Sequence, residues 1–331
     1  MNIHSDDPLR LGPDECHVWR VPLDAPAQDV ERLRSLLSAE ERARAARFVF
    51  EADRRRFVVA HGGLREILAG YVGVAPASLT FASGPSGKPA VVEPRTGLRF
   101  NLSDSRGLAL VAVTRGREVG VDVEAVRAAE DLDDLGASCF SPTERRALAA
   151  VPEASRLEAF FDGWTRKEAF VKMLGDGLSR PLDSFDVTLT PGEPARILRV
   201  EGGRAGDWSL RSIEVGPGHR GALAIEGPAT EIRVRDWVVE SGGTRSSDER
   251  RGPRGQEGVR GGRQPRGAVL DLARRQGVAE RLAACGQERN EERMPGLGQG
   301  DLDRHDAGEP AGRPIREGLT FRWEGVAGAR P

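Results

Sequence analysis

The chain has 331 residues, of which 38% are hydrophobic and 30% charged, and its formal net charge at pH 7 is −2. This length fits one large domain or two to three small ones, and the excess of acidic residues in 1–240 argues against a general nucleic-acid binder. No stretch approaches the roughly 18 apolar residues of a membrane span, and the first residues lack the pattern of a signal peptide. The three cysteines show no metal-binding spacing, so we predict a cytoplasmic protein without a disulfide framework.

The first part of the chain predicts a strand, then helices, then two short strands. Alternating apolar residues indicate a strand at His17–Leu23, and a helical period runs through Ser38–Val72. The short strands are expected around Ser78–Ala82 and Leu98–Ser103.

The second part repeats this order with more strands. Its predicted elements are strands at Leu108–Thr114 and Glu118–Glu124, helices through Ser141–Ala150 and Ser155–Leu174, and strands at Phe185–Thr190, Trp208–Val215, Gly221–Gly227 and Glu231–Val239. Because strands and helices come in blocks rather than in strict alternation, we predict an α+β fold with two similar halves, residues 1–106 and 107–240.

The composition changes near residue 240, and residues 241–331 are rich in glycine and arginine and contain no lysine. Only Ala268–Cys285 holds a helical period in this segment, and its neighbours offer no core to receive it. We therefore predict a disordered tail. A basic nucleic-acid-binding tail is the weaker alternative, because the net positive charge of the segment is small.

Two carboxylates share one face of the strand predicted at Val119–Glu124, VGVDVE. Side chains alternate along a strand, so Asp122 and Glu124 are neighbours on the face opposite the valines. At about 6–7 Å, two such charges repel by roughly 2–3 kcal/mol at an effective dielectric constant near 20. Either this face is open to water on an edge strand, or it lines a cleft in which a cation lies between the carboxylates.

A second motif, WTRKEAFVK at Trp164–Lys172, contains two of the three lysines of this arginine-rich chain. On a helix, Trp164, Glu168 and Lys172 share one stripe. The plain alternative is a surface ion pair beside a core tryptophan. If the helix packs beside Val119–Glu124, Glu168 joins the other two carboxylates, and three oxygen ligands without histidine or cysteine suit Mg²⁺.

A third stretch runs from Gly87 to Ser105 and begins with Gly-Lys-Pro, a constrained turn that presents Lys88. It ends with FNLSDS, where a predicted strand leads into Ser103 and Asp104. Backbone N–H groups and hydroxyls at a strand end suit an anion. Such a turn is a weak signal by itself.

Taken in this order, the motifs resemble those of the Sfp-type 4′-phosphopantetheinyl transferases. Gly-Lys-Pro matches at Gly87–Pro89, FNLSDS resembles the family's FN[LIV]SHS, VGVDVE its [IV]G[IV]D[IV]E, and WTRKEAFVK its W[ST]xKE[AS]xxK. The similarity continues through GDGLSRPLDSF at Gly175–Phe185, and SAEERARAARFVFEADRRRF looks like the family's arginine-rich helix. The resemblance covers about residues 15–240 and ends where the composition changes.

The resemblance implies an activity. Enzymes of this family move the phosphopantetheine arm of coenzyme A to a serine of an apo acyl or peptidyl carrier protein and release adenosine 3′,5′-bisphosphate. Mg²⁺ binds the pyrophosphate and neutralises developing charge. The family further implies two related α+β halves with coenzyme A at their junction, in a monomer that needs neither nucleic acid nor membrane.

The resemblance also implies the site residues. Asp122, Glu124 and Glu168 are the metal ligands, Lys172 contacts the phosphates and takes part in catalysis, and the general base is Glu144 or Glu168. The coenzyme A site comprises Arg44, Arg47, Arg56, Lys88, Pro89, Ser103, Asp104 and Lys172.

One position departs from the family pattern: Asp104 stands where the family has a histidine that approaches the 3′-phosphate of coenzyme A. A carboxylate about 5 Å from a phosphate costs on the order of 3 kcal/mol before compensation. Nearby arginines absorb this charge, or Asp104 points outward, or the chain binds coenzyme A weakly. The alternative functions are a non-catalytic homologue that binds coenzyme A or a carrier protein, and a different Mg²⁺-dependent phosphotransferase or phosphatase, for which the sequence contains no Walker loop or nucleophilic aspartate motif.

Overall fold

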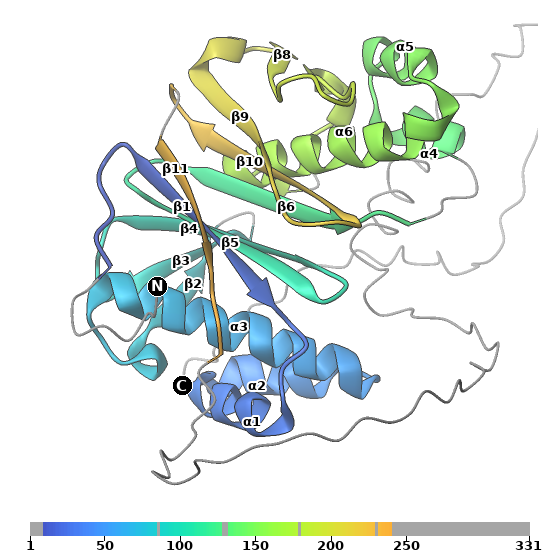
Figure 1. The fold of residues 1–331 in the computed structure, drawn as a ribbon. Helices are drawn as coiled ribbons and strands as arrows, with labels where there is room; N and C mark the ends of the chain where they lie inside the picture. The colour runs from blue at the N-terminus through green and yellow to red at the C-terminus, as the bar shows by residue number, and fades with distance from the viewer. Residues whose placement is uncertain (1–8, 85–86, 128–131, 178–179, 229–230, 240–331) are drawn as a thin grey trace, which may run out of the picture. The chain divides into compact units, whose positions relative to one another are not determined.

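The computed structural model describes residues 9–84, 87–127, 132–177, 180–228 and 231–239 (Figure 1). All described residues lie in one compact unit. The predicted disordered tail, including the stretch with a helical period at Ala268–Cys285, lies outside the described residues. No helix in the described ranges combines the length and the apolar character that crossing a membrane requires.

The described residues form a mixed helix and strand structure, which confirms the predicted α+β class. The helices are α1 (Ala27–Leu36), α2 (Ala39–Ala46), α3 (Glu51–Val72), α4 (Leu132–Cys139), α5 (Pro142–Ala150) and α6 (Glu153–Leu174). The strands are β1 (Glu15–Pro22), β2 (Thr80–Ser83), β3 (Pro89–Glu93), β4 (Leu98–Ser105), β5 (Leu108–Arg115), β6 (Val119–Ala125), β7 (Phe185–Val187), β8 (Ile197–Val200), β9 (Trp208–Ile213), β10 (His219–Glu226) and β11 (Glu231–Asp236).

Two sheets repeat the same topology. The first has the order β11-β1-β5-β4, with β5 antiparallel to both β1 and β4, and β11 parallel to β1. The second has the order β6-β10-β9 and is antiparallel throughout. Strands β1, β5 and β4 therefore correspond in order to β6, β10 and β9, and the short ribbon β2-β3 corresponds to β7-β8.

The helices repeat as well. Helices α2 and α5 both begin with a Ser-x-x-Glu capping box, at Ser38 and Ser141, in which the serine hydroxyl accepts the N–H of the glutamate three residues later. The next long helices, α3 and α6, each have 22 residues and end at a glycine with positive φ, Gly73 and Gly175. This order supports two similar halves.

The predicted boundary between residues 106 and 107 falls inside a hairpin. Arg106 and Gly107 both have positive φ, 41° and 92°, as in a two-residue type I′ turn that joins β4 to β5. Because a turn this short pairs the strands on either side of it, β5 belongs to the first sheet. The topological repeat therefore starts at β6, after Arg115.

Each long helix covers one face of one sheet, α3 the first and α6 the second (Figure 1). A third apolar cluster lies between the sheets and joins Val18, Leu110 and Ala112 of the first to Val121 and Leu223 of the second. The valines of β6 therefore face the first sheet, and the opposite face of β6 lies under α6.

Candidate active site

The face of β6 that carries the two carboxylates is buried against α6. Asp122 is only 3% exposed, so the interpretation of a water-exposed edge face is wrong for this residue. Gly120 permits the close approach, because a Cβ at this position would collide with the backbone oxygen of Ala169 and the backbone nitrogen of Met173. The glycine of VGVDVE thus allows the WTRKEAFVK helix to lie directly on the strand.

The packing brings Lys172 to Asp122. The Lys172 Nζ donates to Asp122 Oδ1 at 2.6 Å and to the Ser103 hydroxyl at 2.9 Å. That hydroxyl in turn donates to Asp122 Oδ1 at 2.8 Å. The second oxygen, Asp122 Oδ2, is buried and has no hydrogen-bond partner among the described residues. A buried carboxylate oxygen without a donor is suited to a cation.

Glu124 lies beside Asp122, as the alternation predicted. Its Oε2 accepts a hydrogen bond from the Ser105 hydroxyl at 2.9 Å. Burial, followed by the neighbouring charge of Asp122, raises the pKa of Glu124 to about 8. The pair of carboxylates is therefore short of positive charge even with Lys172 present.

The third predicted ligand, Glu168, is also buried, at 4% exposure, one helical turn before Lys172. Within the described ranges, however, no group of three acidic, histidine or cysteine side chains is already arranged to hold a metal ion. The oxygen donors and the unpartnered Asp122 Oδ2 fit a hard divalent cation.

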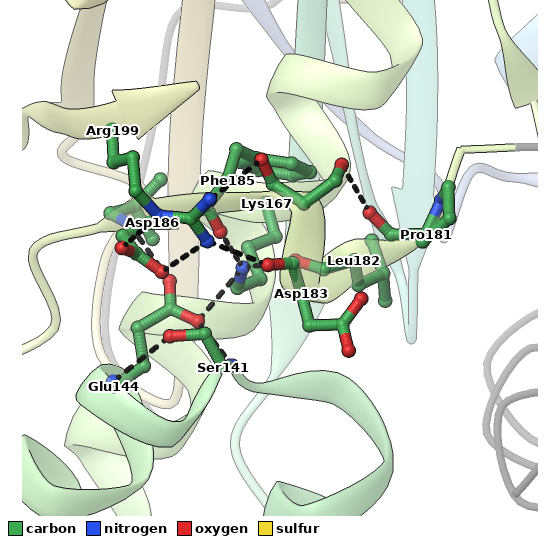
Figure 2. Close-up of polar contacts among 11 residues, drawn as sticks. Ser141, Glu144, Lys167, Pro181, Leu182, Asp183, Phe185, Asp186 and Arg199 are labelled. Carbon is green, nitrogen blue, oxygen red and sulfur yellow. Dashed lines mark hydrogen bonds and ion pairs between the residues drawn. The ribbon is translucent and has the colours of Figure 1, made fainter. Parts of the chain in front are cut away.

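Glu144 occupies a structural position rather than an open one. It is 1% exposed and is the glutamate of the α5 capping box, where its Oε2 accepts the Ser141 N–H at 2.9 Å. Its Oε1 accepts the Val187 N–H at 2.8 Å. The Nζ of the fully buried Lys167 lies 2.8 Å from Glu144 Oε2 and donates to the carbonyls of Leu182 and Phe185 (Figure 2).

The first half of the chain contains the same arrangement. Glu41 of the α2 capping box pairs with the buried Arg65 of α3, which donates to the carbonyls of Pro76 and Leu79. None of the three predicted metal ligands lies in that half. The repeated arrangement favours a structural role for Glu144 over the predicted role as general base.

The predicted coenzyme A residues fall into separate groups. Arg44 and Arg47 are exposed at the end of α2, and the Arg44 guanidinium lies 5.4 Å from the centre of the Phe57 ring. The exposed Asp104 is close enough for its charge to offset the effect of burial, which lowers the pKa of Arg44. The exposure of Asp104 fits an outward-pointing side chain, and its charge interaction with Arg44 fits compensation by an arginine.

The remaining predicted coenzyme A residues already bind protein groups. Arg56 Nε donates to Asp24 Oδ1 at 2.9 Å, and Lys88 Nζ donates to Glu118 Oε2 at 2.6 Å and to the Met173 carbonyl at 2.8 Å. Pro89 is the exposed first residue of β3. The Ser103 side chain is 7% exposed and points toward β6, so its predicted hydroxyl contact with coenzyme A is not supported.

Three residues that form or support the candidate site were not identified from the sequence: Asn101, Ser105 and Lys167. The first two share one face of β4 with Ser103, and their spacing at alternate residues of FNLSDS was the available signal. For Lys167, the signal was the survival of a lysine in an arginine-rich chain. Its Nζ has three oxygen partners, Glu144 Oε2 and the carbonyls of Leu182 and Phe185, where Arg65 takes the corresponding position in the first half.

The second half also has a cavity of about 780 Å³, which is lined by α6, the ends of β9 and β10, and the loop before β8. None of the predicted site residues lines it. Its charged groups include Arg220, which is already paired with Glu158 and Asp162. We therefore locate the candidate site at the contact of β4, β6 and α6.

Comparison with known proteins gives an independent result. The family model described as the 4′-phosphopantetheinyl transferase superfamily matches residues 118–225, and that described as 4′-phosphopantetheinyl transferase, N-terminal, matches residues 24–115. The 4′-phosphopantetheinyl transferase HetI of Nostoc sp. is 40% identical over 221 residues, which cover 66% of this chain and 91% of HetI. The 4′-phosphopantetheinyl transferase Sfp of Bacillus subtilis is 26% identical over 64% of this chain and 92% of Sfp.

Proposed function

The chain belongs to the 4′-phosphopantetheinyl transferase superfamily and is an enzyme of that activity, so we propose that it uses coenzyme A and Mg²⁺ to modify a serine of an apo acyl or peptidyl carrier protein. The observation that carries the proposal is the contact of Lys172 with Asp122, which joins the WTRKEAFVK and VGVDVE motifs in one buried site. Cytoplasmic location and a monomeric state remain predictions from the sequence.

The proposed metal ligands are Asp122, Glu124 and Glu168. The buried, unpartnered Asp122 Oδ2 supports this assignment. A bound Mg²⁺ would neutralise negative charge on the pyrophosphate and on the leaving group.

The proposed reaction makes one P–O bond and breaks another. The carrier serine oxygen attacks the phosphorus that bears the pantetheine arm, and the pyrophosphate bond breaks to release adenosine 3′,5′-bisphosphate. Lys172 holds a phosphate oxygen, and Glu168 takes the serine proton. We prefer Glu168 to Glu144 because Glu144 already uses both carboxylate oxygens inside the protein.

Mass spectrometry of a carrier protein tests this function. The full chain is incubated with Mg²⁺, coenzyme A and an apo acyl or peptidyl carrier, and we expect the carrier to gain one phosphopantetheine group. A carrier whose acceptor serine is replaced by alanine, and a reaction with a chelator, should show no gain. A chain that binds coenzyme A but modifies neither class of carrier is a non-catalytic homologue, and this result would overturn the proposal.

A further inference from the structure

One edge of β6 is bonded by side chains instead of by another strand. Its other edge pairs with β10 through backbone hydrogen bonds. The corresponding free edge of β1 in the first half is covered by β11. A buried strand edge must satisfy its N–H groups, and at β6 the side chains of β4 do so.

Three side chains of β4 form what we call the β4 side-chain ladder: Asn101, Ser103 and Ser105. Asn101 Oδ1 accepts the Val121 N–H at 2.9 Å, Ser103 Oγ that of Val123 at 3.4 Å, and Ser105 Oγ that of Ala125 at 3.1 Å. Both sets are spaced by two residues because side chains and edge N–H groups alternate along a strand with the same period.

Two rungs of the ladder have a second partner. The Ser103 hydroxyl donates to Asp122 Oδ1 at 2.8 Å, and the Ser105 hydroxyl donates to Glu124 Oε2 at 2.9 Å. A serine hydroxyl has one proton, so each serine accepts from the backbone of β6 and commits its own proton to a carboxylate. The third rung, Asn101, bonds the backbone of β6 at the level of Gly120 and Val121, where no carboxylate is present.

We infer that Ser103 and Ser105 are positioning residues that hold Asp122 and Glu124 in the orientation in which they bind a divalent cation. The inference rests on the proposed function, since that function assigns the carboxylates as metal ligands. Groups that hydrogen-bond to ligating carboxylates fix the ligand geometry, and their removal typically lowers metal affinity by about 10–100-fold. Satisfying the backbone of β6 and orienting the carboxylates can be tested separately, because Asn101 bonds the backbone of β6 and no carboxylate of that strand.

Ser105 gives the cleaner test, because Ser103 also contacts Lys172. Mn²⁺ binding to the full chain is measured by electron paramagnetic resonance, with and without coenzyme A, for the unsubstituted protein, Ser105→Ala and Asn101→Ala. We expect Ser105→Ala to weaken Mn²⁺ binding by about 10-fold or more, and Asn101→Ala to lower the melting temperature while Mn²⁺ affinity stays the same.

Ser105→Thr and Ser105→Val supply a matched pair, because the two side chains share a shape and differ in the hydroxyl. Threonine should retain Mn²⁺ affinity and valine should lose it, which keeps the test decisive if Ser105→Ala does not fold. Equal affinity in the threonine and valine variants, or an equal loss in Asn101→Ala, would overturn the inference.

The outcome is distinguishable from failure of the proposed function. If the chain binds Mn²⁺ with the expected dependence on Ser105 but modifies no carrier, the role of Ser105 is supported and the proposed function is contradicted. If the chain modifies carriers but all variants bind Mn²⁺ with equal affinity, the role of Ser103 and Ser105 is contradicted and the proposed function is supported.

Discussion

Asp122 is the carboxylate of the proposed site that joins α6 to β4 through Lys172 and Ser103. One oxygen accepts from both Lys172 and Ser103, while the other has no hydrogen-bond partner in the described structure. The lysine thus neutralises part of the charge and leaves an oxygen available to a cation. The hydrogen bonds of Asp122 lie within the proposed site, so its replacement should affect chemistry more than folding.

Asp122→Ala should lower carrier modification by about 100-fold or more, because a lost metal interaction removes several kcal/mol of transition-state stabilisation. The melting temperature should change little, since the substitution also relieves repulsion with Glu124. Transfer rates and thermal unfolding are measured on the same preparation. Full activity in a well-folded Asp122→Ala protein would contradict the metal assignment.

Asp104→His should lower the KM for coenzyme A and narrow any preference for dephospho-coenzyme A. The charge of Asp104 raises the pKa of Arg44 against the larger effect of burial, and replacing the aspartate removes a negative charge that would repel a phosphate. Asp104→Asn is the matched control, because it removes the charge without adding an imidazole. The measurement is the ratio of the KM for coenzyme A to the KM for dephospho-coenzyme A. If this ratio is unchanged in both variants, Asp104 does not face the 3′-phosphate.

At the scale of elements, the site depends on two contacts of α6: its packing on β6, and its attachment to α5 and to the segment before β7. Gly120 sets the first contact, and the Glu144–Lys167 pair sets the second by tying α6 to α5 and to the segment before β7. Burial raises the pKa of Glu144 and lowers that of Lys167, and their mutual attraction opposes both shifts. A pair of this kind is costly to break at one end.

Gly120→Ala should destabilise the protein by at least about 1–3 kcal/mol, since the added methyl group overlaps backbone atoms of α6. It should also lower transfer, because α6 can relieve the collision only by moving Lys172 away from Asp122. Gly206→Ala is the control: a Cβ there meets no atom within 4 Å. Chemical denaturation and carrier modification are measured for both, and similar behaviour of the two variants would disprove the role of Gly120.

Glu144→Gln should lower the free energy of unfolding by about 3–5 kcal/mol, because it leaves the buried Lys167 without its counter-charge. The double variant Glu144→Gln/Lys167→Met should recover part of this loss in a double-mutant cycle. Under conditions where Glu144→Gln is folded, its transfer rate should remain close to that of the unsubstituted enzyme. A large fall in kcat with an unchanged melting temperature would instead support Glu144 as the general base.

At the scale of the molecule, the two halves are joined by reciprocal contacts. Strand β4 of the first half covers the edge of β6, and β11, which follows the second half, completes the first sheet beside β1. Trp237 after β11 is 1% exposed and donates to Glu66 Oε2 at 3.2 Å. The first core therefore depends on residues near the end of the described chain.

A chain that ends at Ser241 should keep the melting temperature and the transfer rate, because β11 and Trp237 are retained. A chain that ends at Pro228 should be strongly destabilised, since it loses both. Calorimetry and kinetics on one carrier compare these chains with the full-length protein. A large loss of kcat/KM on truncation at Ser241, at an unchanged melting temperature, would show that residues 242–331 contribute to carrier recognition.

The local sequence pattern was sufficient for most of the elements and for which side chains share a face within two of them. Alternation along Val119–Glu124 predicted that Asp122 and Glu124 share a face, and the helical period of Trp164–Lys172 predicted that Trp164, Glu168 and Lys172 share one stripe. Both are periodic properties of a short segment, and the segment itself determines them. The helices predicted through Ser38–Val72 are α2 and α3, whereas α1, α4, β3 and β8 were not predicted.

The tertiary structure determines which residues of other segments pack against those faces. The identity of Glu144 does not reveal that Lys167 and Val187 take up its oxygens, because these partners are brought to it by packing across the second half. In the same way, FNLSDS presents two serines on one face of a strand, but only the position of the β6 edge brings the carboxylates within reach of Ser103 and Ser105. Side-chain direction follows from local geometry, whereas burial and bonding partners follow from contacts between distant segments.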